Sequence, residues 1–390
     1  MISFDEAIRL VRDVARPLGR ESAPIGRAAG RVLAAPVVAT IDSPPADSSA
    51  MDGYAVREAD VPGRLRLVGE SFAGSGFDGT LEPGTCVRIF TGAPVPPGAD
   101  RVVVQEVAVR NGDTVTIAGP PGPDRYIRPR GSDFRTGDLL LEAGRRLDPR
   151  ALVTAAAADV AKVETWRPPA VLVLCTGDEL ASPGEARRRP GDIPESVSFG
   201  VAALAEIWGG RCLGSRRLAD DLPAMERAAG QALDQADLVV VTGGASVGEK
   251  DHAKAMFEPH GLDLIFSKVA IKPGKPVWLG RAGSTLVLGL PGNPTSAMVT
   301  ARLLLAPLVA GLAGRAGALE WRKLPLGDPL PACGDRETFH RARRLETGAV
   351  PVANQDSSAQ KALAEADILL RSRPHDPPRQ AGYEIEALDF

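Results

Sequence analysis

Three short apolar runs, AVLVLC (170–175), ADLVVV (236–241) and TLVLGL (285–290), alternate with stretches that have the periodicity of helices. Those stretches are FGVAALAEIWG (199–209), LPAMERAAGQALDQ (222–235) and PTSAMVTARLLLAPLVAGLA (294–313). Apolar runs of strand length that alternate with helices are typical of βαβ units. The stretch 170–312 therefore predicts an α/β fold, with a doubly wound, mostly parallel sheet.

The stretches on either side of residues 170–312 have different sequence patterns. Residues 4–16 repeat apolar side chains every three or four positions, and residues 147–162 open with an Asp-Pro pair, so both predict helices. Residues 41–146 hold short β-type runs between Gly and Pro turns, and β-like pieces return after Gly314. We expect an N-terminal helical linker domain (1–45 and 125–168), an inserted all-β module (46–124), the α/β domain (169–316) and a small C-terminal β domain (317–390).

Composition narrows the class of protein. The 390 residues include 46 Lys and Arg against 49 Asp and Glu, and this net charge of −3 disfavours binding to nucleic acid or to an anionic membrane. Four cysteines without a C-x-x-C pair argue against a disulfide framework and a zinc cluster. Because we find no signal-peptide pattern and no run of about 18 uncharged apolar residues, we expect a soluble, cytoplasmic protein.

The loops after the three apolar runs are the first candidates for a binding site, since ligands of open α/β sheets bind beyond the carboxyl ends of the strands. These loops read TGDELASPG (176–184), TGGASVGEKDH (242–252) and GLPGNPTSAM (289–298). Each combines Gly or Pro turns with small hydroxyl side chains. Glycine lets backbone N–H groups approach an anion closely. One such loop alone is an ordinary strand-to-helix turn, but three on one sheet edge indicate a site.

The second loop superficially matches two catalytic motifs. Its Gly243–Gly248 spacing is that of a phosphate-binding Walker loop, but Glu249 occupies the position of the required Lys. Its G-x-S-x-G pattern would make Ser246 the nucleophile of an α/β serine hydrolase, with His340 or His375 downstream. The oxyanion-hole loop of such hydrolases is absent from the sequence, so this alternative is less favoured.

Two lysines flank a rigid turn in KVAIKPGKPVWLG (268–280). Lys272 and Lys275 lie on either side of Pro273 and Gly274, so they could direct two ammonium groups at one anion. The alternative is a solvated basic turn. We favour the anion site, because no acidic residue between Lys268 and Leu279 could neutralise the lysines.

Carboxylates gather in the same loops. Such hard oxygen ligands suit Mg²⁺ bound together with a phosphate-containing substrate. One pair stands before a predicted helix and could equally be a helix cap. The carboxylates are Asp178, Glu179, Asp220, Asp221, Glu249 and Asp251.

Two turns of the β module also stand out. SSAMDGYAV places Asp52 in an Asp-Gly turn, and RIFTGAPVPPGAD places Thr91 in another. Alone, each would be a hairpin turn.

The chain resembles the molybdopterin molybdenumtransferase family (MoeA-type), which includes the C-terminal region of gephyrin. The strings that carry the resemblance stand in order over residues 1 to about 312; beyond residue 320 only FHRAR (339–343) and NQDSS (354–358) contribute. They are SAMDGYAV (49–56), TGAPVPPGAD (91–100), IRPRGSDFRTGD (127–138), TGDEL (176–180), TGGASVGEKD (242–251), KPGKP (272–276) and GLPGNPTSAM (289–298).

The resemblance implies molybdenum cofactor biosynthesis, in which Mg²⁺-dependent cleavage of adenylylated molybdopterin releases AMP and molybdenum from molybdate enters the dithiolene. It also implies a homodimer whose site joins the molybdopterin-binding α/β domain of one subunit to the β module of the other. An adenylyltransferase that supplies the substrate and molybdoenzymes that receive the cofactor are the further partners it suggests.

Site roles follow from the resemblance, residue by residue. The catalytic set is Asp52, Thr91, Glu179, Asp220 or Asp221, and Asp251. Within it, Glu179 and Asp251 would hold Mg²⁺, and Asp52 and Thr91 would come from the neighbouring subunit. The substrate-binding set is Gly243, Gly244, Ser246, Lys272, Lys275, Pro291, Asn293, Pro294, Ser296, Arg341 and Ser357.

One string departs from the family pattern. Where the family usually shows Tyr-Asp-Ser-Asn before the first long helix of the α/β domain, this chain has Ile193, Pro194, Glu195, Ser196 and Val197. Two side chains that could cap the helix and touch the substrate are missing, although Glu195 and Ser196 could substitute in part. A pterin-binding or scaffold paralogue with impaired catalysis is therefore the alternative to the enzyme.

Overall fold

The computed structural model describes residues 1–243 and 252–390. The chain divides into two compact units. One comprises Met1–Glu21, Gly30–Ala34 and Thr165–Phe390, and the other comprises Ser22–Ala29 and Ala35–Glu164. The chain passes from one unit to the other within two strands, β1 (Arg20–Pro24) and β12 (Lys162–Trp166). These two strands pair with each other.

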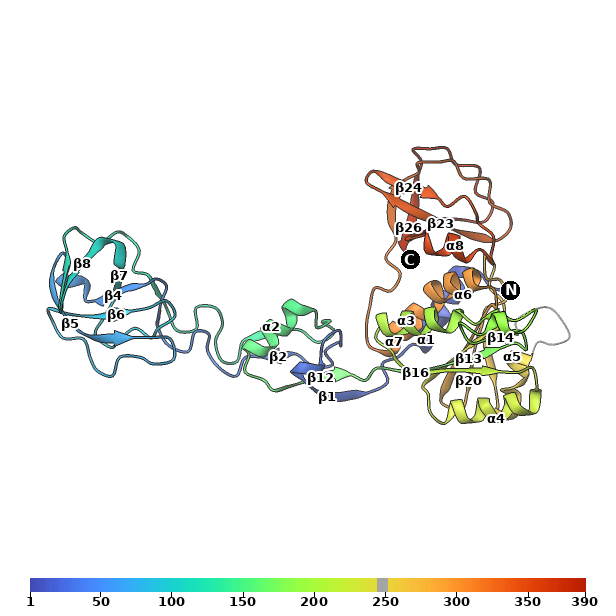
Figure 1. Cartoon of the computed structure of the whole chain (residues 1–390), viewed down its shortest axis with the longest axis horizontal. Helices are drawn as coiled ribbons and strands as arrows, with labels where there is room; N and C mark the ends of the chain where they lie inside the picture. The colour runs from blue at the N-terminus through green and yellow to red at the C-terminus, as the bar shows by residue number, and fades with distance from the viewer. Residues whose placement is uncertain (244–251) are drawn as a thin grey trace. The chain divides into compact units, whose positions relative to one another are not determined.

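A six-stranded sheet forms the centre of the first unit (Figure 1). Its strand order is β16-β13-β17-β21-β20-β18, and the four strands from β16 to β21 are parallel while β20 and β18 are antiparallel additions. Three of the parallel strands are the predicted apolar runs. The bounds are β13 (Ala170–Thr176), β16 (Arg211–Leu218), β17 (Leu238–Thr242), β18 (Asp263–Phe266), β20 (Trp278–Ala282) and β21 (Thr285–Leu290).

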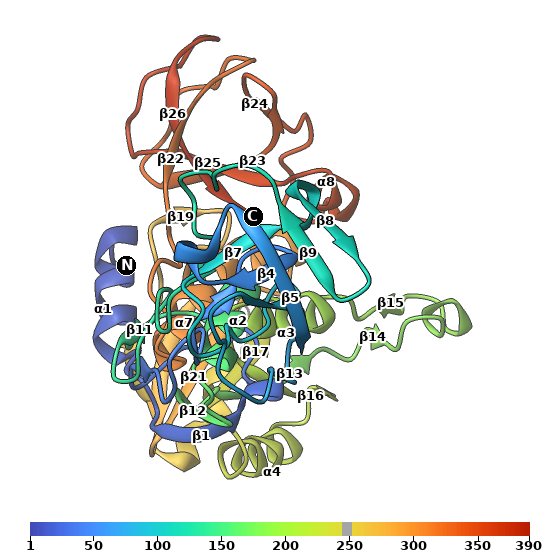
Figure 2. The same ribbon diagram turned by 90° about the vertical axis from the view of Figure 1, so that its left-hand side faces the viewer.

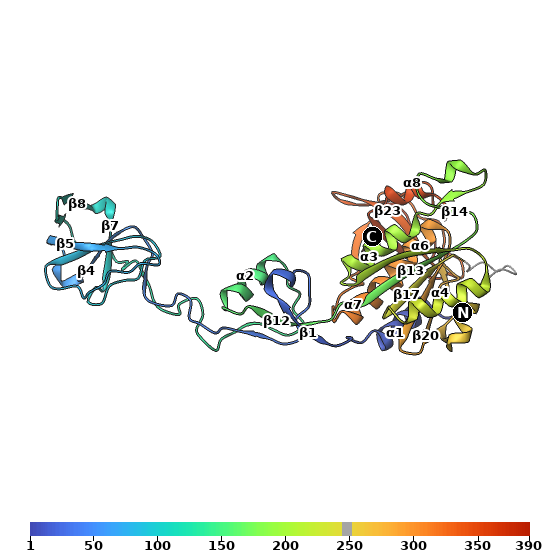
Figure 3. The same cartoon turned by 60° about the horizontal axis from the view of Figure 1, so that its bottom comes forward.

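Both faces of this sheet are covered by helices, as Figure 3 shows. Alternate side chains of β13 point to opposite faces, so Val173 belongs to one apolar core and Leu174 to the other. The first core includes helices α1, α3, α6 and α7, and the second includes α4 and α5. The doubly wound α/β prediction is confirmed. The helices are α1 (Phe4–Val14), α3 (Val197–Ile207), α4 (Leu222–Leu233), α5 (His252–Ala255), α6 (Pro294–Thr300) and α7 (Ala306–Leu312).

Helix α1 begins where its sequence places a cap. The Ser3 hydroxyl accepts a hydrogen bond from the N–H of Glu6, and the buried face carries Phe4, Ile8 and Val11. We predicted this helix for a linker domain, whereas its apolar face packs in the core of the α/β sheet.

A single π-helical turn, Ala301–Leu305, joins α6 to α7. Among the described residues, one helical stretch, Pro294–Leu312, is long and apolar enough to span a membrane by length and composition. Its most apolar window is 83% buried inside the protein, as expected for a core helix.

The C-terminal part forms a second sheet in the same unit, with the order β19-β23-β25-β26-β22 and with β24 paired to β23. Strand β19 comes from the Lys272 turn, so this sheet is tied to the α/β part through the backbone. A short helix, α8, precedes β25. The bounds are β19 (Ile271–Lys272), β22 (Arg322–Pro325), β23 (Glu337–Leu345), β24 (Gly348–Pro351), α8 (Gln360–Ala364), β25 (Ile368–Ser372) and β26 (Glu384–Asp389).

The second unit contains the predicted β module as a six-stranded sheet of order β7-β4-β6-β5-β9-β8. Its remaining elements are the short ladders β2–β11 and β3–β10, and helix α2 (Pro149–Ala157), which Asp148 caps through the N–H of Ala151. The bounds are β2 (Val37–Val38), β3 (Ser48–Ser49), β4 (Gly53–Val56), β5 (Gly63–Ser71), β6 (Thr85–Ile89), β7 (Arg101–Val104), β8 (Ala108–Asn111), β9 (Thr114–Ile117), β10 (Ile127–Arg128) and β11 (Leu139–Leu141). The exact domain limits stay a prediction.

Candidate functional site

The three loops predicted to form a site begin at the same edge of the central sheet. Because β13, β17 and β21 are parallel and in register, Cys175 pairs with Thr242, and Thr242 pairs with Leu290. The loops then start at Gly177, Gly243 and Pro291. Strand topology thus brings together three segments whose starting points are spread from residue 177 to residue 291.

The loops touch at the backbone. Gly243 has a φ of 90°, and a Cβ on it would lie 2.5 Å from the carbonyl oxygen of Thr176. A Cβ on Gly292 would lie 3.3 Å from the Cα of Gly243. Both glycines are therefore required by the close approach of the three loops.

A pocket of about 860 Å³ opens above this edge. Its size lies within the range of about 300 to 1,000 Å³ that is usual for small-molecule and cofactor sites. Predicted site residues among its lining are Glu179, Asp220, Gly243, Lys275, Pro291, Asn293, Pro294 and Ser296.

Two acidic residues of the pocket, Glu179 and Asp220, come from loops that follow parallel strands of the sheet. Glu179 follows β13, and its two carboxyl oxygens lie only 2.7 and 2.8 Å from the position that a Cβ on Gly177 would take. Asp220 follows β16, and its backbone N–H donates to the Asp178 carboxylate at 3.0 Å. Asp221 is the N-cap of α4, makes no capping bond with its side chain and does not line the pocket. The geometry therefore favours Asp220 over Asp221.

The two lysines of the predicted anion site are placed differently. Lys275 lines the pocket, whereas Lys272 lies on β19, which pairs in parallel with β23. Between them Gly274 has a φ of 104°, and a Cβ there would clash with the Thr300 side chain of α6. The turn is thus packed against the fold rather than free in solvent.

Arg341 lies on β23 and is 1% exposed. Its Nη1 donates to the backbone oxygen of Asp356 at 3.1 Å, but its buried Nε has no hydrogen-bond partner in the described structure. Burial lowers the pKa of its guanidinium, and the Asp356 charge opposes this effect. A buried guanidinium with an unused donor is electrostatically incomplete.

Neighbouring His340 is also buried, and its Nε2 lacks a partner among the described residues. Burial lowers the pKa of this imidazole to about 4, and the positive charges of Lys272 and Arg341 act in the same direction. The region around Lys272, His340 and Arg341 is therefore electropositive.

The NQDSS string meets the third loop. The Asn293 side-chain amide donates to the Ser357 hydroxyl at 2.9 Å, and the Thr295 N–H donates to the Ser357 carbonyl oxygen. Ser358 lines the pocket, while Ser357 does not. The C-terminal part thus completes one wall of the site.

The altered string before α3 retains a cap. Glu195 is 8% exposed, and its carboxylate accepts hydrogen bonds from the Ser198 N–H at 2.8 Å and the Ser198 hydroxyl at 2.5 Å. Ser196 occupies the N-cap position without a side-chain capping bond. Of the two expected substitutes, Glu195 therefore provides the capping interaction.

Asp52 and Thr91 meet in the β module. One Asp52 carboxyl oxygen accepts hydrogen bonds from the Thr91 N–H at 2.7 Å and the Thr91 hydroxyl at 2.8 Å. These bonds lower the pKa of Asp52, with the backbone bond as the largest cause. The two turns that the sequence singled out thus form one cluster, in the second compact unit.

Three predicted site residues, Gly244, Ser246 and Asp251, lie outside the described residues, as does Glu249. Within the described ranges, no group of three or more His, Cys, Asp or Glu side chains is arranged to hold a metal ion. Glu179 and Asp220 nevertheless suit Mg²⁺, which usually takes only one or two protein carboxylates together with water and phosphate oxygens.

Sequence reasoning missed several residues of the pocket. Lys268 is the third lysine of KVAIKPGKP, so the absence of acids in that stretch could have indicated it. Ser358 adjoins the predicted Ser357. Polar lining residues that were given no role in the sequence analysis include Thr176, Thr242, Lys254, Ser267, Lys268, Ser358 and Gln360.

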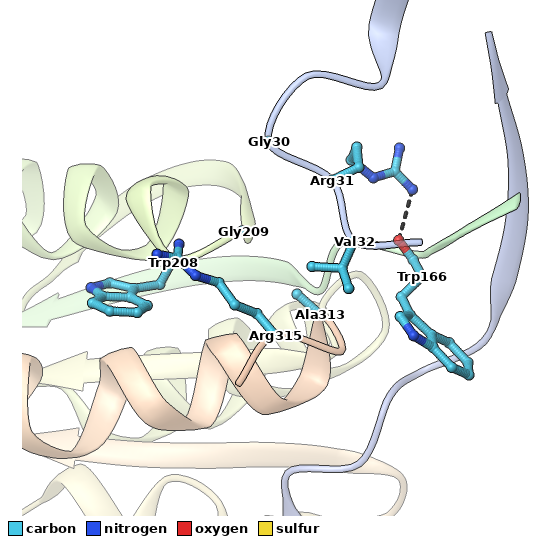
Figure 4. Close-up of a pocket in the computed structure, with 8 residues that line it drawn as sticks. All are labelled: Gly30, Arg31, Val32, Trp166, Trp208, Gly209, Ala313 and Arg315. Atoms are coloured by element: carbon cyan, nitrogen blue, oxygen red, sulfur yellow. Dashed lines mark hydrogen bonds between the residues drawn. The ribbon is translucent and has the colours of Figure 1, made fainter. Parts of the chain in front are cut away.

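A second, much smaller cavity lies in the same unit (Figure 4). Its volume of about 20 Å³ admits about one water molecule. Arg31, which donates to the carbonyl oxygen of Trp166 at 2.8 Å, lines it together with Trp208 and Arg315. Its size excludes a role in substrate binding.

Comparisons with known proteins agree with this geometry. Residues 2–158 match the family described as MoeA N-terminal region (domain I and II), and residues 172–311 match the probable molybdopterin binding domain. A molybdopterin molybdenumtransferase of Haemophilus influenzae is 39% identical over 83% of this chain and 80% of its own length. That of Synechococcus elongatus is 34% identical over 94% of each chain. A crystal structure of a molybdopterin biosynthesis MoeA protein from Pyrococcus horikosii superposes with a TM-score of 0.85, at 29% identity, over 100% of this chain and 99% of that one.

Proposed function

The chain belongs to the molybdopterin molybdenumtransferase family and is an enzyme of molybdenum cofactor biosynthesis, and we propose that it inserts molybdenum from molybdate into adenylylated molybdopterin with release of AMP. The observation that carries this proposal is the pocket of about 860 Å³, which collects Glu179, Asp220 and Lys275 at the carboxyl ends of parallel strands. Carboxylates and a lysine in one pocket are what a metal-assisted reaction of a phosphoanhydride requires.

The chemistry divides into two steps. Water adds across the phosphoanhydride bond, which gives AMP and the phosphate of molybdopterin. Molybdate then condenses with the dithiol: the two sulfurs bind molybdenum, and one oxygen of molybdate leaves as water with the two thiol protons. The first step needs stabilisation of phosphate charge, and the second needs a site for a tetrahedral dianion.

For the first step, Glu179 and Asp220 would hold Mg²⁺, with Asp251 as the further carboxylate that the family pattern assigns. Bound there, Mg²⁺ would neutralise charge that develops on the phosphate oxygens. Lys275 and Lys268, which line the same pocket, orient the phosphates by charge-assisted hydrogen bonds. Gly243, Gly244 and Ser246 are proposed to cradle the terminal phosphate of the pterin.

For the second step, Lys272 and Arg341 would bind molybdate with Lys275. The unpaired Nε of Arg341 supports this role, because an oxyanion would supply the missing acceptor and add negative charge to that of Asp356. The Asn293–Ser357 hydrogen bond positions the hydroxyl-rich wall of the site. Pro291 and Pro294 shape the turn into α6.

We further propose that the active form is a cytoplasmic homodimer, in which Asp52 and Thr91 of one subunit complete the pocket of the other. Support comes from their placement in a compact unit separate from the one that holds the pocket. Molybdoenzymes would receive the product, and an adenylyltransferase would supply the substrate.

The test is AMP release by the purified protein from adenylylated molybdopterin, with Mg²⁺ and with or without molybdate. We expect release that depends on both ions. No AMP under any of these conditions would refute the proposed reaction. Labelling of Ser246 by a fluorophosphonate probe would instead support the hydrolase alternative.

A further inference from the structure

Four side chains of the β module are stacked in layers beside the Asp52–Thr91 cluster. The Arg88 guanidinium lies between two rings, 5.1 Å from the Tyr54 centroid and 4.8 Å from the Phe90 centroid. The next layer is Phe72, whose ring is nearly parallel to that of Phe90, at 11° and 4.7 Å between centroids. We call these four residues the aromatic stack.

The inner end of the aromatic stack is fixed. Tyr54 is 5% exposed, and Arg88 donates to the Gly53 carbonyl oxygen at 3.0 Å and to the Gln105 side chain at 2.5 Å. These contacts hold Arg88 in place, and cation–π attraction orders the rings on both of its sides.

The outer end is exposed yet rigid. Phe72 is 45% exposed, although aromatic side chains usually bury most of their surface. Backbone hydrogen bonds run in both directions between Phe72 and Ser75, and the Phe90 N–H donates to the Ser71 carbonyl oxygen. The Phe72 ring is therefore a preorganised apolar surface and not the tip of a loose loop.

A polar group of matching chemistry adjoins the aromatic stack, because Thr91 follows Phe90 and Asp52 lies two positions before Tyr54. Thr91 follows Phe90 directly and bonds only Oδ1 of Asp52, and no hydrogen bond to Oδ2 is found within the described residues. An aromatic face with a free carboxylate oxygen beside it suits a flat heterocycle that carries an amino group. The ring stacks on the face, and the amino group donates to the carboxylate.

We propose that the aromatic stack, through Phe72, binds a planar amino-bearing nitrogen heterocycle of the substrate, with Asp52 as acceptor for its amino group. This inference rests on the proposed function, in which the substrate carries two such rings, the pterin and the adenine. It assigns to the β module a role in substrate recognition beyond the two residues that the family pattern indicates.

The test uses the full-length protein and two probes, 6-hydroxymethylpterin and AMP, titrated separately by calorimetry. In Phe72→Ala, we expect affinity for one of the two probes to fall about tenfold, which identifies the ring that stacks. Phe72→Trp should keep wild-type affinity, because it retains an aromatic face. Tyr383→Ala serves as the matched control, since Tyr383 is 41% exposed and stacks on Arg379 in the other unit.

Unchanged affinities for both probes in a folded Phe72→Ala protein would overturn the inference. So would a change of oligomeric state with unchanged affinities, which would assign Phe72 to a protein interface. AMP release by the wild type separates this inference from the proposed function. If the wild type releases AMP and only the Phe72 result is negative, the proposed function stands and the stack has another role.

Discussion

Arg341 allows the sharpest test of the anion site, because its buried charge is incomplete without a ligand. Its side chain is 1% exposed, and its Nε has no partner among the described residues. A hydrogen bond between a charged group and a ligand typically contributes about 1.5 to 3 kcal/mol. Arg341→Met should therefore weaken molybdate binding by about 10- to 150-fold.

Thermal denaturation reports this change without any turnover. At molybdate concentrations about 100 times the wild-type Kd, the ligand should stabilise the folded wild type by about 2.7 kcal/mol. Under the same conditions the weaker affinity of Arg341→Met leaves only about 0.3 to 1.4 kcal/mol. Since about 1 kcal/mol shifts the Tm of a unit of this size by about 2 to 4 °C, the difference between the two proteins is measurable.

The control is Arg343→Met, two positions along β23. Arg343 is exposed and forms no ion pair in the described part of the chain, so this variant should respond to molybdate as the wild type does. Without ligand, Arg341→Met should be about as stable as the wild type, because it removes a buried charge together with one hydrogen bond. An unchanged molybdate dependence of the Tm in Arg341→Met would refute the reasoning. Tungstate and sulfate should compete in the wild type.

Three further outcomes are expected. His340→Gln should flatten the pH dependence of stability, because folding lowers the pKa of His340 to about 4 and its neutral form stabilises the fold above pH 6.5. In the wild type, a contribution on the order of 3 kcal/mol is lost as the pH falls from 6.5 to 4, and urea unfolding across this range would measure it. Glu179→Gln and Asp220→Asn should lower AMP release at limiting Mg²⁺ by at least about 100-fold, while Asp221→Asn should keep the rate within a few fold of the wild type. Equal rates for the two Asp variants would contradict the assignment to Asp220. Mixing inactive Asp52→Ala and Asp251→Ala proteins should restore part of the activity, because each heterodimer has one intact site. If activity does not recover although mass spectrometry confirms subunit exchange, Asp52 lies outside its partner's site.

The parts of the fold that were predictable from sequence are those with strong hydrophobic patterning. Strands β13, β17 and β21 are buried on both faces, so their sequences are continuous apolar runs. Strand β16 escaped prediction because it is an edge strand with mostly exposed side chains, and its sequence RCLGSRRL has no apolar run. The α1 helix was predicted correctly, but its packing partner was not, since periodicity identifies an apolar face and not what covers it.

The candidate site also has residues that the sequence could indicate and residues that it could not. Loop chemistry singled out Glu179 and Asn293, and the paired lysines of 268–280 singled out Lys275. All three residues line the pocket, while their roles stay a prediction. Local sequence could not distinguish Asp220 from Asp221, since the difference lies in which of the two adjacent residues lines the folded pocket. Nor could it indicate that Arg341 is buried, because β23 alternates its faces and one of them packs toward the α/β core.

The altered string at 193–197 argues less for a scaffold role than the sequence alone indicates. The family pattern places side chains there that can cap the first turn of α3, and Glu195 performs that task through its two bonds to Ser198. Its carboxylate also lines the pocket, alongside Glu179 and Asp220. The departure therefore exchanges the aspartate of the family string for Glu195 and loses the asparagine. Because a carboxylate is kept in the string and the lysines stay in place, this change is compatible with turnover. The scaffold alternative would require the loss of charged groups, and the described pocket retains them.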